Sequence, residues 1–274
     1  MIHSRRSFIK AAGVSVLAIG AAPAIKAVAA SGSGAASLPS KTRRPEAFSA
    51  KRWGMAIDCR RMNGDIAGNI VKACRKANNV PDFSHKPDED KYPGLRPPKK
   101  DQELKWIWEE SYHHAFPEME DEFLADKFKS MPFLVTCNHC KNAPCVQACP
   151  TRATFKREDG VVMMDFHRCI GCRFCMAACP FGARSFNFRD PKPFIPEINP
   201  DFPTRSKGVV EKCNLCAGRL AKGLQPACVE ASEGTIVVGD LEDPGSEIRA
   251  LLKENYAIRR KQELGTEPSV YYIM

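Results

Sequence analysis

Residues 137–150 read CNHCKNAPCVQACP, and residues 169–180 read CIGCRFCMAACP. The first stretch spaces its cysteines as Cys-x2-Cys-x4-Cys-x3-Cys-Pro, and the second spaces them as Cys-x2-Cys-x2-Cys-x3-Cys-Pro. The second pattern is one by which bacterial proteins bind [4Fe–4S] clusters, and its fourth cysteine ligates a neighbouring cluster. The two stretches therefore predict two clusters that exchange fourth ligands and lie close enough together to pass single electrons.

Two further copies of this pattern are incomplete. The segment APCVQACP at 143–150 reappears as PACVEASE at 226–233, where Ser232 replaces the final cysteine, and Cys213-x2-Cys216 precedes it. Near the N-terminus, RMNGD at 61–65 parallels RCIGC at 168–172 without its cysteines, and Cys74 alone survives, at the fourth position. If the first and last repeats exchange fourth ligands as the central two do, one site has lost every cysteine and its neighbour retains all of them.

The repeats thus predict three [4Fe–4S] clusters with named ligands. The expected sets are Cys137, Cys140, Cys145 and Cys179 for the first cluster, Cys169, Cys172, Cys175 and Cys149 for the second, and Cys74, Cys213, Cys216 and Cys228 for the third. The remaining cysteine, Cys59, is expected to be a small buried hydrophobic residue at a strand end. Zinc sites and a disulfide framework are alternatives, but uninterrupted four-cysteine runs that end in proline favour clusters.

The first thirty residues predict export. Ser4-Arg5-Arg6-Ser7-Phe8-Ile9-Lys10 matches a twin-arginine signal, the apolar residues 11–25 are short for a bilayer span, and residues 27–29 resemble a cleavage site. An uncleaved membrane anchor remains an alternative. Because the twin-arginine route carries folded proteins, it suits a protein that is loaded with clusters in the cytoplasm. We therefore expect the protein on the periplasmic or extracytoplasmic face of the cell membrane.

The formal net charge of +9 raises the question of nucleic-acid binding. No motif of interleaved basic and aromatic residues is present, so we expect no nucleic-acid partner. Thiolate-bound clusters carry about −2 each when oxidised, and the basic residues offset part of that charge. We find no nucleophile–base pair and no phosphate-binding loop, and we assign no catalytic residue.

The chain of 274 residues divides into segments of different composition. We expect strands at 53–58, 133–136, 154–156, 161–165, 184–188 and 235–238, a helix at 67–78, an amphipathic helix at 101–115, a short helix after Asp243-Pro244, and a strand or docking tail at 270–273. The expected organisation is a signal peptide (1–30), a linker (31–50), a degenerate first repeat (51–80), an insert (81–130), a central two-cluster domain (131–190), a fourth repeat (191–240) and a C-terminal helix and tail (241–274).

Some other residues invite a functional interpretation, and each has a simpler alternative. His139 stands between two proposed ligands and is a candidate for a hydrogen bond near a cluster. The glycines Gly171 and Gly182 either bring backbone N–H groups to cluster sulfurs or only form turns. For His113 and His114 we expect a solvated helix end, for Asp65 no iron ligation, and for Trp106, Trp108 and Tyr112 either partner contacts or packing on the protein's own core.

These features resemble the four-repeat iron–sulfur subunits of molybdopterin-oxidoreductase and polysulfide-reductase-like membrane complexes. The resemblance rests on Cys137-Asn138-His139-Cys140, on the Cys-Pro ends of the two blocks and on GLQPAC at 223–228, and it covers roughly residue 52 to the C-terminus. It implies an α+β fold of two interwoven ferredoxin-like halves with pseudo-two-fold symmetry, short strands and helices, and a long irregular insert. It further implies an electron-transfer subunit rather than an enzyme.

The sequence departs from that family at one end. Family members usually hold four clusters in a line, and the site lost here corresponds to the end nearest the molybdenum subunit. The three-cluster pattern, the export signal and the insert resemble the exported iron–sulfur subunit of Dsr-type complexes of dissimilatory sulfur metabolism. Partners implied are a polysulfide-reductase-type, quinone-reactive membrane subunit and a multihaem cytochrome c or other redox subunit. An electron-input subunit of an exported molybdenum or cytochrome reductase, or a soluble ferredoxin-like carrier, are alternatives.

Overall fold

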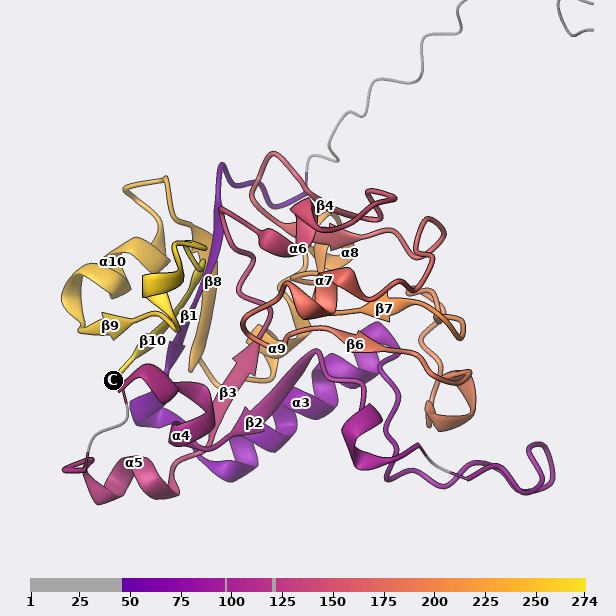
Figure 1. Cartoon of the computed structure of the whole chain (residues 1–274). Coiled ribbons are helices and arrows are strands. Elements are labelled where there is room, and N and C mark those ends of the chain that lie inside the picture. Colours follow the sequence, from indigo (N-terminus) through magenta and orange to yellow (C-terminus); the bar gives the residue numbers. More distant parts are fainter. Residues whose placement is uncertain (1–45, 97, 120–121) are drawn as a thin grey trace, which may run out of the picture. The chain divides into compact units, whose positions relative to one another are not determined.

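In the computed structural model, which describes residues 46–96, 98–119 and 122–274, the buried run Trp53–Asp58 forms strand β1. This strand lies inside a four-stranded sheet of order β8-β1-β10-β9 (Figure 1). It pairs antiparallel with β8 (Ile236–Asp240) and parallel with β10 (Val270–Ile273), which in turn pairs antiparallel with β9 (Ala257–Ile258). Residues 270–273, expected as a strand or docking tail, are therefore a buried strand.

Both faces of β1 are covered, which explains why its whole length is apolar or buried. Helix α10 (Glu247–Glu254) packs on one face, where Ile248 joins Ala56 and Ile273 in a small core. Met55 and Ile57 face the main core on the other side. Helix α10 begins after Ser246 rather than at Asp243, because the Asp243 carboxylate instead accepts the N–H of Gly245 at 2.9 Å within a turn.

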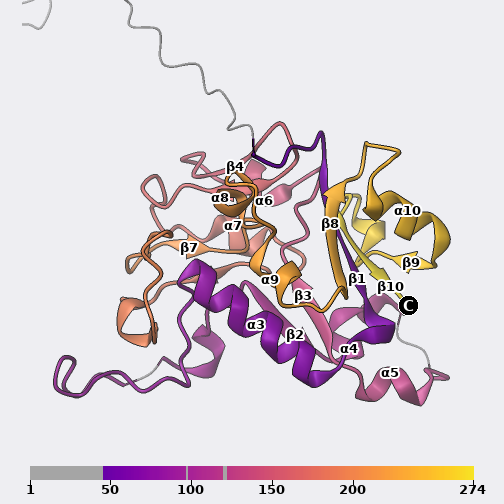
Figure 2. The ribbon, with the colours of Figure 1, turned by 180° about the vertical axis from the view of Figure 1, so that it is seen from behind.

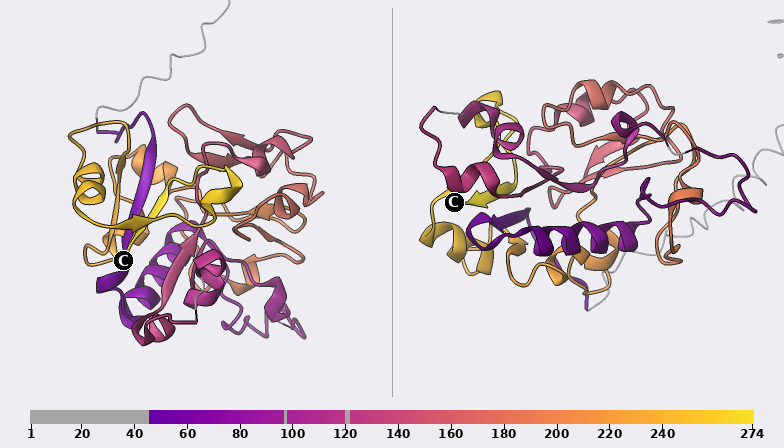
Figure 3. Two further views of the ribbon diagram at one scale, coloured as in Figure 1. Left: turned by 60° about the vertical axis from the view of Figure 1, so that its left-hand side comes forward. Right: turned by 90° about the horizontal axis from the view of Figure 1, so that it is seen from below.

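Helix α3 (Gly64–Asn78) is the longest helix in the described residues and confirms the helix expected at 67–78. It starts earlier than expected because the Asn63 side chain accepts the N–H of Ile66 at 2.9 Å and caps the first turn. It ends where Asn79 adopts a left-handed conformation with φ of 50°. Its buried residues lie on one face (Ala67, Ile70, Cys74 and Asn78), and the helix crosses the lower side of the molecule (Figure 3).

The cysteine-rich part of the chain consists of short elements. Strand β3 (Phe133–Thr136) pairs with β2 (Ile107–Glu110), β4 (Thr154–Lys156) with β5 (Val162–Met164), and β6 (Ser185–Phe186) with β7 (Val210–Glu211). Short helices alternate with them: α6 (Pro144–Gln147), α7 (Phe174–Ala177), α8 (Ala217–Leu220) and α9 (Ala227–Glu230). Figures 1 and 2 show α6, α7 and α8 on the side of the four-stranded sheet away from α10.

The expectation of a helix at 101–115 is wrong. The segment instead forms a 3-10 turn (Lys100–Gln102), strand β2 and the single helical turn α4 (Tyr112–Ala115). Residues of this segment instead make contacts with residues far away in the sequence, which a local pattern does not reveal. The indole of the buried Trp106 donates to Glu211 at 2.8 Å, and Thr136 donates to the Trp106 carbonyl at 2.8 Å. Residues 107–110 of the insert therefore pair with β3.

The remaining described elements are short. They are the 3-10 turns Cys59–Arg61, Pro117–Met119, Lys192–Phe194 and Gln262–Leu264, and helix α5 (Asp126–Ser130). The expected signal peptide and most of the expected linker lie outside the described residues. Within the described ranges, no helix combines the length and the apolar character that a bilayer crossing requires.

Candidate metal-cluster sites

Four cysteines line one small cavity, and they are the four predicted for the first cluster. We call this set site A: Cys137, Cys140, Cys145 and Cys179. The first two follow strand β3, Cys145 lies in α6 and Cys179 follows α7, so the second block supplies the fourth thiol. Burial and the adjoining Cys137 thiol raise the pKa of the Cys140 thiol to about 12. A bound metal would supply the positive charge that releases such protons.

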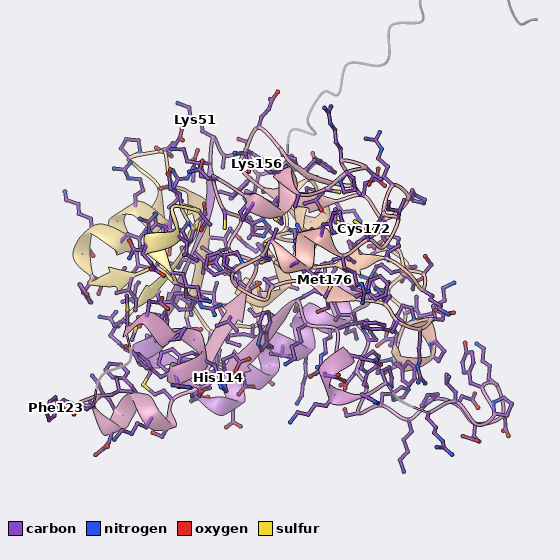
Figure 4. All side chains as sticks on the ribbon, in the orientation of Figure 1. Lys51, His114, Phe123, Lys156, Cys172 and Met176 are labelled. Carbon is purple, nitrogen blue, oxygen red and sulfur yellow. The ribbon has the colours of Figure 1, made fainter. Side chains whose placement is uncertain are left out.

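We call the cysteines predicted for the second cluster site B: Cys149, Cys169, Cys172 and Cys175. The buried Cys175 thiol interacts electrostatically with Cys149 and Cys169, so the first block again approaches the second. The N–H groups of Thr154 and Val210 donate to the sulfurs of Cys149 and Cys169 at 3.4 Å and 3.5 Å. Cys172 precedes α7 and is exposed, and Figure 4 shows it with Met176 on the side away from α10.

The third predicted set is site C: Cys74, Cys213, Cys216 and Cys228, all of which are buried. Cys74 lies in α3, Cys213 follows β7, Cys216 precedes α8 and Cys228 lies in α9. Burial raises the pKa of the Cys74 thiol well above its ordinary value, and the other three thiols raise it further. Three segments that are far apart in the sequence therefore bring their thiols together in the interior.

Asn78 is a neighbour of site C that sequence reasoning missed. It lies one helical turn after Cys74, and its side-chain amide is directed at the sulfurs of Cys74 and Cys216 at 3.8 Å and 3.6 Å. The same amide nitrogen donates to the Cys74 carbonyl at 3.0 Å. The available signal was an asparagine on the buried face of the helix that also carries the predicted ligand.

The three sites are neighbours in the order C, A, B. Cys213 of site C interacts electrostatically with Cys137 of site A. Cys175 of site B interacts in the same way with Cys145 of site A. Site A therefore lies between the other two.

The positions at which the incomplete repeats lack cysteines hold side chains that make other contacts. Ser232, which replaces a cysteine, donates its hydroxyl to the Val229 carbonyl at 2.7 Å and accepts the N–H of Ile236 at 3.2 Å. Met62 is buried in the main core, and Arg61 donates to the carbonyls of residues 233 and 234. Asp65 is exposed on the first turn of α3. Local hydrogen bonds and side-chain packing thus occupy these positions.

The donor set fits iron–sulfur clusters, which are held by cysteine thiolates. At site A the four thiols line a cavity, and a cluster bound in that cavity would contact all four. Within the described ranges, no three Cys, His, Asp or Glu side chains converge closely enough to hold a single metal ion.

His139 is a buried hydrogen-bonding residue. Its Nδ1 accepts the N–H of Val162 at 3.1 Å, which leaves the ring proton on Nε2. Burial, assisted by the nearby charges of Lys212 and Arg184, lowers the pKa of His139 well below its ordinary value, so the ring is neutral. Nε2 has no partner among the described residues.

The other residues noted in the sequence have structural surroundings. Trp106 and Tyr112 are buried in the main core and Trp108 is half-buried, so these three aromatic residues pack on the protein itself. His114 is exposed, with Nδ1 3.2 Å from the Glu110 carboxylate. Cys59 is 1% exposed directly after β1, which confirms the expectation of a buried residue at a strand end.

Two buried cations beside the sites were also missed. Arg184 is 5% exposed and Lys212 is 1% exposed. Lys212 directly precedes Cys213, and its ammonium donates to the carbonyls of Cys213 and Val162. Arg184 closely follows Cys179 and lines the cavity of site A. The signal available in the sequence was only a basic residue close to a predicted ligand, which does not indicate that the residue is buried.

Comparison with known proteins identifies related chains. Residues 129–192 match the family described as a 4Fe-4S dicluster domain. The chain is 40% identical over 244 residues to the Hdr-like menaquinol oxidoreductase iron-sulfur subunit 1 of Archaeoglobus fulgidus, covering 81% of this chain and 83% of that one. It is 34% identical over 252 residues to the menaquinone reductase iron-sulfur cluster-binding subunit of Nitratidesulfovibrio vulgaris, covering 81% and 88%.

A third relative is the B subunit of the polysulfide reductase of Wolinella succinogenes, with 32% identity over 226 residues, or 82% of this protein and 95% of that subunit. These similarities extend well beyond the central cysteine blocks, because each covers 81–82% of this chain. The mixed α+β structure, with its small sheets and short helices, agrees with a ferredoxin-like cluster domain. The chain therefore belongs to the family of iron–sulfur subunits of menaquinol oxidoreductase, menaquinone reductase and polysulfide reductase complexes, which transfer electrons and are not themselves catalytic.

Proposed function

We propose that the protein holds three [4Fe–4S] clusters, at sites A, B and C, and relays electrons along them. When bound, such a cluster supplies a centre that accepts and gives up one electron at a time. The residues of the chain hold the thiolates in place and keep water away from sites A and C. The observation that carries the proposal is the meeting of Cys74 with Cys213, Cys216 and Cys228, because it completes a third set of four thiols.

Site B is the end of the relay that a redox partner can approach. Its Cys172 is exposed, and the adjoining Ile170 and Phe174 are 68% and 61% exposed, which is unusual for large apolar side chains. Site C is buried at the other end of the described series. This difference supports an orientation in which a partner exchanges electrons at site B.

Iron analysis of two cysteine variants tests the cluster count. The wild-type protein should contain about 12 iron atoms, and Cys74→Ala should contain about 8, because a [4Fe–4S] cluster holds four. The matched control Cys59→Ala removes a thiol of similar burial and should retain about 12. Iron and sulfide assays with EPR of the reduced protein measure both. A wild-type content near 16, or full iron content in Cys74→Ala, contradicts the proposal.

We further propose that the subunit works in a membrane complex of dissimilatory sulfur metabolism. Its partners there would be a polysulfide-reductase-type quinone-reactive subunit and a multihaem cytochrome c or other redox subunit. The relatives named for menaquinol, menaquinone and polysulfide support this assignment. Affinity purification from detergent-solubilised membranes should recover the quinone-reactive subunit. Recovery of the protein alone from the soluble fraction, or with a molybdenum subunit instead, would contradict it.

We also propose that the protein is exported by the twin-arginine route and lies outside the cytoplasm. It is supported by the sequence Ser4-Arg5-Arg6-Ser7-Phe8-Ile9-Lys10. The double variant Arg5→Lys, Arg6→Lys should keep the cluster-loaded protein in the cytoplasm, and cell fractionation measures this. Unchanged export of the double variant would rule out the route.

The sequence repeats support two interwoven halves related by a pseudo-two-fold axis.

A further inference from the structure

Arg184 places a charged group in the cavity of site A. It is 5% exposed and lines that cavity together with the four site A cysteines. One terminal nitrogen, Nη1, donates to the Thr154 hydroxyl at 3.2 Å and lies 3.8 Å from the Met164 sulfur. The other donors, Nε and Nη2, are buried and bond to no nitrogen or oxygen among the described residues, and the Cys145 thiol lies close enough to interact with the guanidinium. Buried N–H donors without partners are costly, so a partner for them is expected at this place.

The guanidinium of Arg184 also lacks a counter-charge. In the part of the chain that the structure describes, no carboxylate forms an ion pair with it. Arg205 provides the contrast, because its fully buried side chain pairs with Glu211 at 2.5 Å and donates to the carbonyl of Asn79 at 2.7 Å. A buried cation without an anion is strongly destabilising. We therefore expect a negatively charged group other than a carboxylate beside Arg184.

The groups around Arg184 that can become negative are thiols of two different sites. The guanidinium interacts electrostatically with Cys145 and Cys137 of site A and with Cys175 of site B. One buried positive charge thus lies beside both central sites.

We propose that Arg184 is the shared counter-charge of the clusters at sites A and B, donates N–H hydrogen bonds to their thiolate side and raises the reduction potential of both. The inference rests on the proposed function, because it assumes clusters at these sites. Reduction adds one negative charge to a site, and no bond is formed or broken. A fixed positive charge in a buried environment stabilises that added charge, and N–H donation to sulfur acts in the same direction. Arg184 acts on the two clusters through its charge and its N–H groups, and it is not a ligand.

A redox titration of the full-length, cluster-loaded protein tests this role. For each of sites A and B, the ratio of reduced to oxidised cluster is compared at that site's own wild-type midpoint potential. In Arg184→Met this ratio should fall about tenfold, which corresponds to a midpoint lowered by about 59 mV for a one-electron couple. The signals of A and B are those that persist when site C is removed by Cys74→Ala. The signal of site C should keep its wild-type midpoint in Arg184→Met.

The matched control is Arg168→Met. It removes the same charge next to the ligand Cys169, but from an exposed side chain that pairs with Asp165 at 3.3 Å. Because water and salt screen an exposed charge, its effect on the ratio should stay below about twofold. A shift in Arg168→Met as large as that in Arg184→Met would overturn the proposal.

Further outcomes separate this inference from the proposed function. If Arg184→Met holds the wild-type iron content and leaves both midpoints unchanged, the inference is wrong while the three-cluster relay stands. If Arg184→Met does not fold, Arg184→Gln decides, because it keeps a donor and removes the charge: lowered midpoints support the inference and unchanged midpoints overturn it. A wild-type protein without clusters at A and B would contradict the proposed function itself.

Discussion

The thiol of Cys59 shows what distinguishes a buried cysteine from a member of a cluster site. It lies directly after β1 and is 1% exposed. Burial and the neighbouring Asp58 carboxylate raise the pKa of this thiol from 9.0 to about 12. Cys74 is also buried, but the other thiols of site C surround it. Burial alone therefore does not identify a ligand, whereas a group of thiols does.

The raised pKa of Cys59 predicts an alkaline loss of stability. The unfolded chain ionises this thiol above about pH 9, whereas the folded chain keeps the proton until about pH 12. The stability contributed by the raised pKa is fully present below about pH 9 and is lost as the pH rises to about 12, at up to about 1.4 kcal/mol per pH unit. The thermal stability of the cluster-loaded protein should therefore fall more steeply with pH in the wild type than in Cys59→Ala. Parallel curves for the two proteins would contradict this account.

At the scale of elements, the loops around the cysteines depend on left-handed backbone at a few positions. Gly171 has φ of +71°, and a Cβ there would lie 2.4 Å from the Gly208 carbonyl oxygen. Gly182 has φ of +63°, but a Cβ there would meet nothing within 4 Å. The first glycine thus permits a close approach of two backbone segments beside site B, and the second permits only the turn.

The two glycines form a matched pair for substitution. Gly182→Ala should cost about 1–2 kcal/mol, the strain of a left-handed alanine. Gly171→Ala should cost more, and it should lower the iron content at site B, because the Cys169–Cys172 loop must move away from residue 208. Thermal unfolding and iron analysis measure both effects. Equal losses of stability in the two variants, with full iron in each, would show that the close approach is unimportant.

Helix α3 links the sheet to site C. It begins after strand β1 and the turn at 59–61, and its buried face carries Cys74 toward α9. Capping by Asn63 and the left-handed Asn79 set its ends, so both signals that define the helix are local. The position of the Cys74 thiol next to α8 and α9 is not local, because those helices lie far downstream in the sequence.

At the scale of the whole molecule, the proposed clusters join segments that lie in different parts of the sequence. Site A joins the loop after β3 to the end of α7, and site C joins α3 to the segment after β7 and to α9. The sheet β8-β1-β10-β9 and helix α10 contain none of the proposed ligands. We therefore expect the sheet and α10 to rely on ordinary packing and the cysteine-bearing segments to rely in part on bound clusters.

Removal of the clusters should unfold these parts unequally. After treatment with a chelator and an oxidant, amide hydrogen exchange should accelerate first in 137–149, 169–179 and 213–228, where short helices have little packing of their own. The amides of β1, β8 and β10 should remain protected longest. Hydrogen exchange followed by mass spectrometry measures this order. Simultaneous loss of protection throughout the protein would instead indicate a single cooperative unit.

The amino-acid sequence by itself determined the proposed ligand sets, most of the strands and the helix α3. Cysteine spacing, apolar runs such as 53–58 and the hairpin at 154–164 are local patterns, and the structure confirms these strands. The internal repeats allowed one long-range inference, that Cys74 meets Cys213, Cys216 and Cys228, because a lost partner site left a matching set of cysteines. Local pattern failed at 101–115, where pairing with β3 and the Trp106–Glu211 hydrogen bond outweighed helical spacing.

Only the tertiary structure decided what surrounds the thiols. It placed site A next to sites C and B, buried Met62 and Ser232 at positions where the repeats lack a cysteine, and left Arg184 in the site A cavity without a carboxylate partner among the described residues. The physical reason is that burial and electrostatic interactions depend on distances across the folded chain, whereas a ligand motif depends on spacing along it. The proposed ligands can therefore be predicted from the sequence, but the burial of the charged residues beside them is seen only in the fold.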